Sequence, residues 1–126
     1  MENNEQNLQL GERLMACLEA CDVDATRALY KPDARIWHNF DQLCQPLEDN
    51  LKSLQWMHRK LKNLRYDIKR REPIPNGFYQ EHVLRGTLAS GDEFAMPACA
   101  IIKVEDGLIV SLDEYLDTVH THPLLE

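Results

Sequence analysis

The chain has 126 residues and a formal net charge of −7, from 14 Lys and Arg against 21 Asp and Glu. This length suits one domain with one core, and 44% hydrophobic with 28% charged residues excludes a disordered chain. The acidic balance disfavours nucleic acid and anionic membranes as partners. The polar first residues predict no secretory signal, and no apolar run is long enough to span a membrane. We therefore expect one cytoplasmic domain over 1–126, with 1–7 and 118–126 as flexible ends.

The cysteine pattern argues against redox and structural-zinc chemistry. The four cysteines are Cys17, Cys21, Cys44 and Cys99. Without an export signal they are expected to be reduced thiols, and no Cys-x-x-Cys pair occurs. Cys17 with Cys21, and His120 with His122, each form only half of a metal site. We interpret the first pair as small buried side chains and the second as part of a solvated tail, and we expect no metal and no cofactor.

The first part of the chain predicts two helices and a short strand. Apolar residues recur at the helical period over 7–21, which predicts a long helix. Asp24 is a plausible N-cap for a short helix through Tyr30, and Pro32 ends it because proline cannot extend a helix. Residues 34–38 then combine a branched and an aromatic side chain, which predicts a short strand.

A third helix is expected to start at Pro46, a residue suited to a first helical turn. It is followed by a stripe of apolar residues at helical spacing, namely Leu47, Leu51, Leu54 and Leu61. His58 lies in line with that stripe, so we expect it to be packed and hydrogen-bonded rather than a ligand. The basic cluster over 60–71 is interpreted as a solvated helix end and strand rather than a nucleic-acid surface.

From residue 64 onwards the sequence predicts antiparallel strands. The predicted strands are 64–69, 78–88, 93–104 and 109–117, separated by turns at 73–77, 90–91 and 105–107. Three helices followed by a long meander indicate an α+β domain with the helices packed on one side of the sheet.

Turn lengths predict which side chains share a face of the sheet. A two-residue loop at 90–91 and a three-residue loop at 105–107 place together the side chains of Glu81, Val83, Arg85, Met96, Ala98, Ala100, Val110, Leu112, Glu114 and Leu116. This face is mostly apolar with small residues in its centre, which leaves room for a helix or a ligand. A one-residue slip would instead bring His82 and Leu84 to this face. Two alternatives therefore remain for which side of the 78–88 strand lines the pocket.

Glu114 is the main candidate for chemistry on that face. It lies among leucines and alanines, where desolvation would tend to raise the pKa of a carboxyl group, and such carboxyls often mark functional pockets. The alternative is a structural pair between Glu114 and Arg85. The opposite face, with Tyr115 and Ile101, is expected to be solvated or to meet a second subunit.

The order of these elements resembles the SnoaL-like branch of the nuclear transport factor 2-like superfamily. The resemblance rests also on the segment 28–39 before the third helix and on Asp-Glu-Tyr-Leu-Asp over 113–117. The likeness covers about residues 8–117. This branch includes polyketide cyclases, ketosteroid isomerases and limonene-epoxide hydrolases. It implies a curved antiparallel sheet wrapped by three N-terminal helices into a cone, a pocket at the wide end, and dimers formed through the sheet. It is specific for fold and weak for activity.

The resemblance to ketosteroid isomerases is incomplete. The general-base position falls on His38, and a histidine can also move protons near neutral pH. The oxyanion-holding Tyr falls on Leu14, and the second donor falls on Cys99 or Ala100. Because the oxyanion donors of such an isomerase are missing, we reject that specific activity.

The resemblance to limonene-epoxide hydrolases is also partial. The positions that hold water fall on Trp37, Asn39 and Glu114, but those of the Asp-Arg pair fall on Glu81 and Val83, or on their neighbours after a slip. That mechanism would lack its proton donor, since Arg85 is too permanently protonated to serve. The resemblance implies that a SnoaL-type cyclase needs only one acid/base group in an apolar cone. His38, Asn39 and Glu114 would be enough to meet that requirement.

We therefore expect a small acid/base enzyme of lyase, isomerase, cyclase or hydratase type, acting on a small hydrophobic molecule and forming a homodimer. His38 and Glu114 are the candidate catalytic residues. The predicted substrate-binding residues are Tyr30, Trp37, Asn39, Val83, Met96, Ala98, Leu112 and Leu116, with Glu81 and Arg85 as polar partners. A non-catalytic ligand binder and a protein-interaction module on the same fold remain as alternatives.

Overall fold

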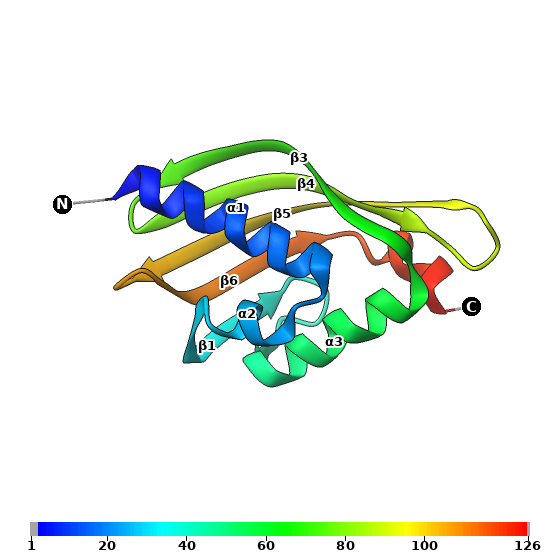
Figure 1. Ribbon diagram of the computed structural model, residues 1–126, viewed down its shortest axis with the longest axis horizontal. Coiled ribbons are helices and arrows are strands. Elements are labelled where there is room, and N and C mark those ends of the chain that lie inside the picture. Colours follow the sequence, from blue (N-terminus) through cyan, green and yellow to red (C-terminus); the bar gives the residue numbers. More distant parts are fainter. Residues whose placement is uncertain (1–2, 126) are drawn as a thin grey trace.

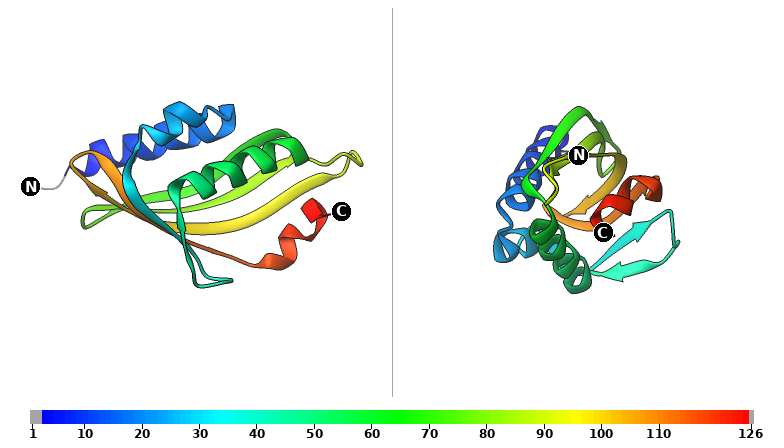
Figure 2. Two further views of the ribbon diagram at one scale, coloured as in Figure 1. Left: turned by 90° about the horizontal axis from the view of Figure 1, so that it is seen from below. Right: turned by 90° about the vertical axis from the view of Figure 1, so that its right-hand side faces the viewer.

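The structure is a computed structural model that describes residues 3–125. Three helices lie together on one side of a curved, unclosed sheet, and the chain ends in a short 3-10 helix beside the far end of that sheet (Figures 1 and 2). The elements are α1 (Asn4–Ala20), α2 (Val23–Arg27), β1 (Tyr30–His38), β2 (Cys44–Pro46), α3 (Leu47–Lys60), β3 (Lys62–Ile74), β4 (Gly77–Thr87), β5 (Glu93–Glu105), β6 (Leu108–Leu116) and η1 (Thr118–Leu125).

The six strands lie in the order β2-β1-β6-β5-β4-β3. Strands β3 to β6 form the antiparallel meander that the sequence predicts, and β1 joins its edge in parallel with β6. The parallel pair is possible because α3 and the meander separate β1 from β6 in the chain. The α+β class and the curved sheet with helices on one side are confirmed, and β2 is an added short edge strand.

The start of α2 differs from the expected one by two residues. Asp22, not Asp24, caps this helix, because its carboxylate accepts a hydrogen bond from the Ala25 amide at 3.1 Å. The helix ends at Arg27, and Tyr30 begins β1 instead of ending the helix. This places Tyr30 in the sheet, where it is 5% exposed.

The hairpin between β4 and β5 corrects the expected register. Leu88 and Asp92 close it with a backbone hydrogen bond of 2.9 Å, so the loop has three residues instead of the expected two. Leu84 therefore faces Met96 and His82 faces Ala98. The extra loop residue shifts β4 by one position, which exchanges its two faces.

The hairpin between β5 and β6 also differs from the expected loop, yet it keeps the expected face of β6. Its turn has two residues, Asp106 and Gly107, both with positive φ. Val110 is then an unpaired bulge residue, since Lys103 pairs with Ser111 and Val104 with Ile109. The bulge restores the alternation that brings Glu114 to the same face as Ala100. As a result Ile109, not Val110, faces the core.

The core is divided along the sheet. One cluster lies under α1 and the start of α3, and includes Leu10, Leu14, Ile36, Phe78 and Ile109, all at most 2% exposed. A second cluster lies under the end of α3 and against η1. His58 is hydrogen-bonded to the Leu18 carbonyl at 2.7 Å, as expected.

Within the described residues, the segments expected as flexible ends contain helical structure, while residues 1–2 and 126 of those segments lie outside the described part. The first helix begins at Asn4, and η1 buries Leu124 against the second cluster, where it is 2% exposed. No helix within 3–125 is long and apolar enough to cross a membrane.

Candidate functional site

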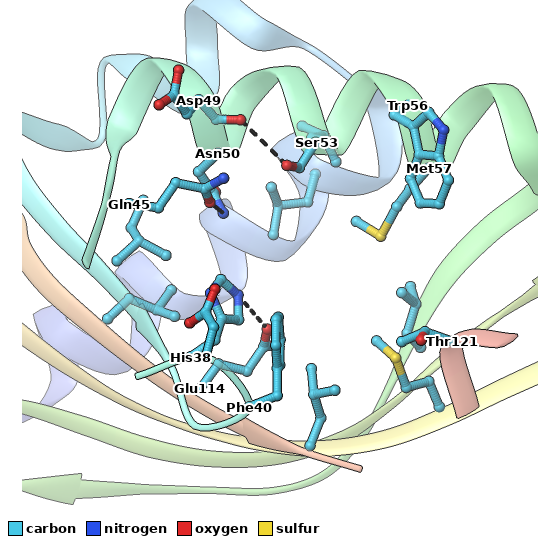
Figure 3. Close-up of a pocket in the computed structure, with 18 of the residues that line it drawn as sticks. His38, Phe40, Gln45, Asp49, Asn50, Ser53, Trp56, Met57, Glu114 and Thr121 are labelled. Carbon is cyan, nitrogen blue, oxygen red and sulfur yellow. Dashed lines mark hydrogen bonds and ion pairs between the residues drawn. The ribbon is translucent and has the colours of Figure 1, made fainter. Parts of the chain in front are cut away.

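A cavity of about 590 Å³ lies between α3, η1 and the concave face of the sheet. Its floor is formed by β1, β6 and the neighbouring strands, and its opposite wall by one face of α3 (Figure 3). The apolar part of the lining includes Ile36, Leu54, Leu84, Met96, Leu112, Leu116 and Leu124. This volume is in the range that holds a small organic ligand.

The floor of the cavity carries a carboxylate between two imidazoles. Glu114 Oε1 lies 3.3 Å from His38 Nε2, and Glu114 Oε2 lies 3.7 Å from His82 Nε2. The side chains of His38 and Glu114 are only 17% and 21% exposed, and that of His82 is 4% exposed. Figure 3 shows His38 and Glu114 pointing toward each other under α3.

The two imidazoles reverse the pKa expectation for Glu114. Desolvation raises the pKa of this carboxyl group, as expected, but contacts from His38 and His82 outweigh burial and lower it to about 2. In return, the contact with Glu114 raises the pKa of His38 despite its burial. At neutral pH Glu114 is therefore ionised, and His38 titrates above its ordinary range.

Two tyrosines line the cavity near this cluster. Burial, and secondarily the charge of Glu114, raises the pKa of both Tyr30 and Tyr66, so both hydroxyls stay protonated at neutral pH. The Tyr66 ring also packs edge-on against the His82 ring, with centroids 5.2 Å apart. Tyr30 and Tyr66 are therefore available as hydrogen-bond donors inside the cavity.

The α3 wall is polar toward the start of the helix and apolar toward its end. The residues of α3 labelled in Figure 3 are Asp49, Asn50, Ser53, Trp56 and Met57. Asn50 donates a hydrogen bond of 3.1 Å to Gln45, and Ser53 donates one of 3.3 Å to the Asp49 carbonyl. A ligand in the cavity would thus find a polar strip opposite the His38–Glu114 pair.

The structure brings only part of the predicted site together. The predicted residues that line the cavity are Tyr30, His38, Met96, Leu112, Glu114 and Leu116. Ala98 is in the same row of β5 but outside the lining, between its partners His82 and Leu116. Trp37 points to the outer face, where it packs against Tyr115 with ring centroids 5.3 Å apart. It is therefore not a cavity residue.

Asn39 does not line the cavity, and its side chain instead forms a hydrogen bond with the backbone of β6. Its side-chain oxygen accepts a hydrogen bond of 2.9 Å from the backbone amide of Leu116. Its backbone amide donates one of 3.1 Å to the backbone carbonyl of Glu114. These bonds extend the pairing of β1 with β6 beyond the last residue of β1. Asn39 therefore fixes the backbone on which Glu114 stands.

The shift of β4 removes Glu81, Val83 and Arg85 from the predicted site. All three lie on the outer face of β4, while their neighbours face the core. Arg85 donates to the Asp67 carboxylate at 3.0 Å, which rules out its pairing with Glu114. Glu81 accepts from the Tyr79 hydroxyl instead.

Sequence reasoning missed His82, Tyr66 and the polar face of α3. His82 was reachable only through the alternative register of the 78–88 strand. On α3, Asp49, Ser53 and Met57 repeat every four residues, which is a second helical stripe beside the leucines. That spacing was the signal available in the sequence. Within 3–125 no group of three or more His, Cys, Asp or Glu side chains is arranged to hold a metal ion.

Comparison with known proteins agrees with this fold. A family model described as SnoaL-like domain matches residues 12–112. No curated protein matches the chain. The chain is similar in structure to IdmH from Streptomyces antibioticus, described as a putative polyketide cyclase, with a TM-score of 0.84, 20% identity, and coverage of 95% of this chain and 98% of that one.

Two further solved structures have the same fold. PrhC from Penicillium brasilianum has a TM-score of 0.86 and 12% identity, with 98% of this chain and 88% of that one covered. A protein from Catenulispora acidiphila with a ketosteroid isomerase-like fold, solved in complex with trimethylamine, has a TM-score of 0.72 and 15% identity, with 84% and 83% covered. At these identities the likeness concerns the fold alone.

Proposed function

The chain belongs to the SnoaL-like domain family, and from that premise we propose that it is a cofactor-independent acid/base enzyme that moves a proton on a small, mainly apolar molecule. The observation that carries this proposal is the partly buried His38–Glu114 pair on the floor of a ligand-sized cavity. A carboxylate that contacts an imidazole orients it and stabilises its charged form. Proton transfer by such a positioned group is a common source of catalysis.

His38 is the proton carrier in this proposal, and Glu114 supports it. The low pKa of Glu114, about 2, makes this carboxylate a weak base near neutral pH. The contact with Glu114 raises the pKa of His38 from its ordinary value of 6.5, so the protonated imidazole is favoured. A general base or acid works best when its pKa lies near the working pH. The two groups titrate as a coupled pair.

Tyr30 and Tyr66 supply the hydrogen bonds for a developing oxyanion. The position that holds a tyrosine in ketosteroid isomerases is Leu14 here, which is completely buried. The two cavity tyrosines are protonated, Tyr30 is buried and Tyr66 is partly buried, and hydroxyl donors in such surroundings stabilise an enolate more strongly than water does. The pair therefore takes over the function that the missing family residues would perform.

The lining and the rim indicate an apolar substrate with one polar end. Phe40, Leu43 and Leu125 are 51%, 65% and 69% exposed and belong to the cavity lining, so the mouth itself presents apolar side chains. Ser53 and Asn50 offer hydrogen bonds on the α3 wall. A carbonyl compound of the size of a short polyketide or a terpenoid meets these requirements, and cyclase-type structural neighbours support the same class.

A panel of apolar ketones and enones tests the proposal. We expect proton exchange at the carbon next to the carbonyl, followed by NMR in deuterium oxide, and its loss in His38→Gln. Stabilisation by a ligand without exchange or turnover would instead assign the chain as a binder. A ligand at 100 times its Kd raises the free energy of unfolding by about 2.7 kcal/mol, so binding is measurable on its own.

The outer face of the sheet is proposed as a homodimer interface. Trp37 and Tyr115 pack edge to face there, and Tyr115 is 43% exposed in the single chain. On the same face of β5, Cys99 pairs with Tyr115 and Ile101 pairs with Tyr79. Aromatic side chains with a polar tip are frequent at protein interfaces.

A further inference from the structure

A row of polar side chains continues from the cavity floor into the core and ends at Arg71, which is partly buried. Arg71 Nε donates to Gln80 Oε1 at 2.7 Å, and Gln80 Nε2 lies 2.9 Å from His82 Nδ1. His82 Nε2 in turn faces Glu114 Oε2 at 3.7 Å. Gln80 is 0% exposed and His82 is 5% exposed, so water does not compete for these contacts.

The donors and acceptors in this row allow one arrangement. A guanidinium group has only donors, so the Gln80 atom that contacts Arg71 is the amide oxygen. The amide nitrogen then points at His82 Nδ1, and since it also only donates, Nδ1 accepts and carries no proton. The remaining ring proton of His82 is on Nε2, where it points toward Glu114.

We propose that Gln80, oriented by Arg71, is a positioning residue that holds His82 in the Nε2-protonated neutral tautomer, so that His82 acts as a fixed hydrogen-bond donor to Glu114 and His38 alone exchanges a proton. The consequence for catalysis rests on the proposed function. The tautomer itself does not, because it follows from the contacts of Gln80.

The fold contains the features that this row requires. Lys69 is a bulge residue in β3, and the bulge turns Arg71 to the same face as Gln80. Gly11 of α1 leaves space for the guanidinium, because a Cβ atom there would stand 2.7 Å from Arg71 Nε. Arg71 Nη2 is buried without a hydrogen-bond partner. The arginine is thus held at the cost of one unpaired polar atom.

Small residues on β5 let His82 reach across to β6. His82 pairs with Ala98, and Glu114 pairs with Ala100, so only methyl groups stand between the imidazole and the carboxylate. The other titratable groups around His82 are Tyr66 on β3, packed on its ring, and His38 beyond Glu114. The Met15 sulfur on α1 accepts a second contact from the Gln80 amide at 3.4 Å.

Nitrogen-15 NMR of histidine-labelled protein at pH 7 tests this inference without any substrate. The His82 signals are assigned by their loss in His82→Gln. We expect an unprotonated Nδ1 and a protonated Nε2 in the wild-type protein. In Gln80→Glu, a carboxylate accepts from both Arg71 and His82, so we expect loss of the unprotonated Nδ1 signal.

The matched control is Glu81→Gln, the neighbouring residue of β4 on the outer face, which should leave the His82 signals unchanged. If Gln80→Glu does not fold, Arg71→Met replaces it, and there the freed amide should allow both His82 tautomers to appear. A protonated Nδ1 in the wild-type protein, or His82 signals unaffected by changes at both Gln80 and Arg71, would overturn the inference. Absence of any enzymatic activity with the expected tautomer in place would count against the proposed function only.

Discussion

His38 and Glu114 are direct register partners in the pairing of β1 with β6, and their side chains meet 3.3 Å apart on the concave face. Their contact depends on two local features, one in β6 and one directly after β1. The bulge at Val110 turns Glu114 inward, and Asn39 ties the end of β1 to Leu116. The site is therefore built at the junction of the meander with β1.

The stability difference between the wild-type protein and Glu114→Gln should depend on pH. The pKa of Glu114 falls from 4.5 to about 2 on folding, so its contribution is present above pH 4.5 and is lost as the pH falls toward 2. The pKa of His38 is raised from 6.5, so its contribution is present below pH 6.5 and is lost as the pH rises through the folded value. Urea unfolding measured from pH 3 to 9 should show the largest difference in stability between pH 4.5 and pH 6.5. A difference independent of pH would contradict the pairing.

His38→Gln should lower kcat/KM by about 10²–10⁴-fold, which is the usual contribution of a positioned acid/base group. Glu114→Gln should shift the pH profile of kcat/KM to lower pH, because the pKa of His38 loses its main cause of elevation. Steady-state kinetics on a substrate found in the ketone panel measures both effects. Equal activity of the wild-type protein and His38→Gln would remove His38 from the mechanism.

Tyr66→Phe should reduce kcat by about 10²-fold, as expected when one oxyanion donor is removed. The phenyl ring keeps the edge-on packing against His82, so the fold should be retained. Tyr79→Phe is the matched control, since Tyr79 lies on the outer face of β4 and its hydroxyl contacts Glu81. Rates and melting temperatures of the two variants separate a catalytic hydroxyl from a structural one.

Arg85→Met should leave ligand binding and activity unchanged. Its guanidinium pairs with Asp67 on the outer face, and both side chains are about one third exposed, so the loss of stability should be small because solvent screens the pair. Urea unfolding and ligand titration check this prediction. A marked loss of binding would favour the other register of β4, in which Arg85 faces the cavity.

Tyr115→Asp should convert a dimer into a monomer, because it places a charge at the centre of the proposed interface beside Trp37. Light scattering at micromolar concentration gives the mass of both proteins. Asp117→Asn, at an exposed residue just after the end of β6, serves as the control. A monomeric wild-type protein would show that the outer face has another role.

Much of the fold could be predicted because local patterns carry it. The leucine stripes of α1 and α3 and the alternation in the meander are short-range signals, and the structure confirms the elements they predict. The cap of α2 was misplaced by two residues because Asp22 and Asp24 are equally suited to capping. Strand β2 has only three residues, and its exposed edge position gave no pattern to recognise.

The sequence by itself determined that an acid near the end of the last strand shares a face with the small and apolar residues of β5, and that His38 ends the strand now seen as β1. Only the tertiary structure decided which face of β4 meets them, because the length of one loop shifts the register by one residue and exchanges every side chain. This exchange brought in His82 and Gln80 and moved Arg85 out. It also decided the pKa of Glu114, since the charge state of a buried group depends on neighbours that only the folded sheet brings together.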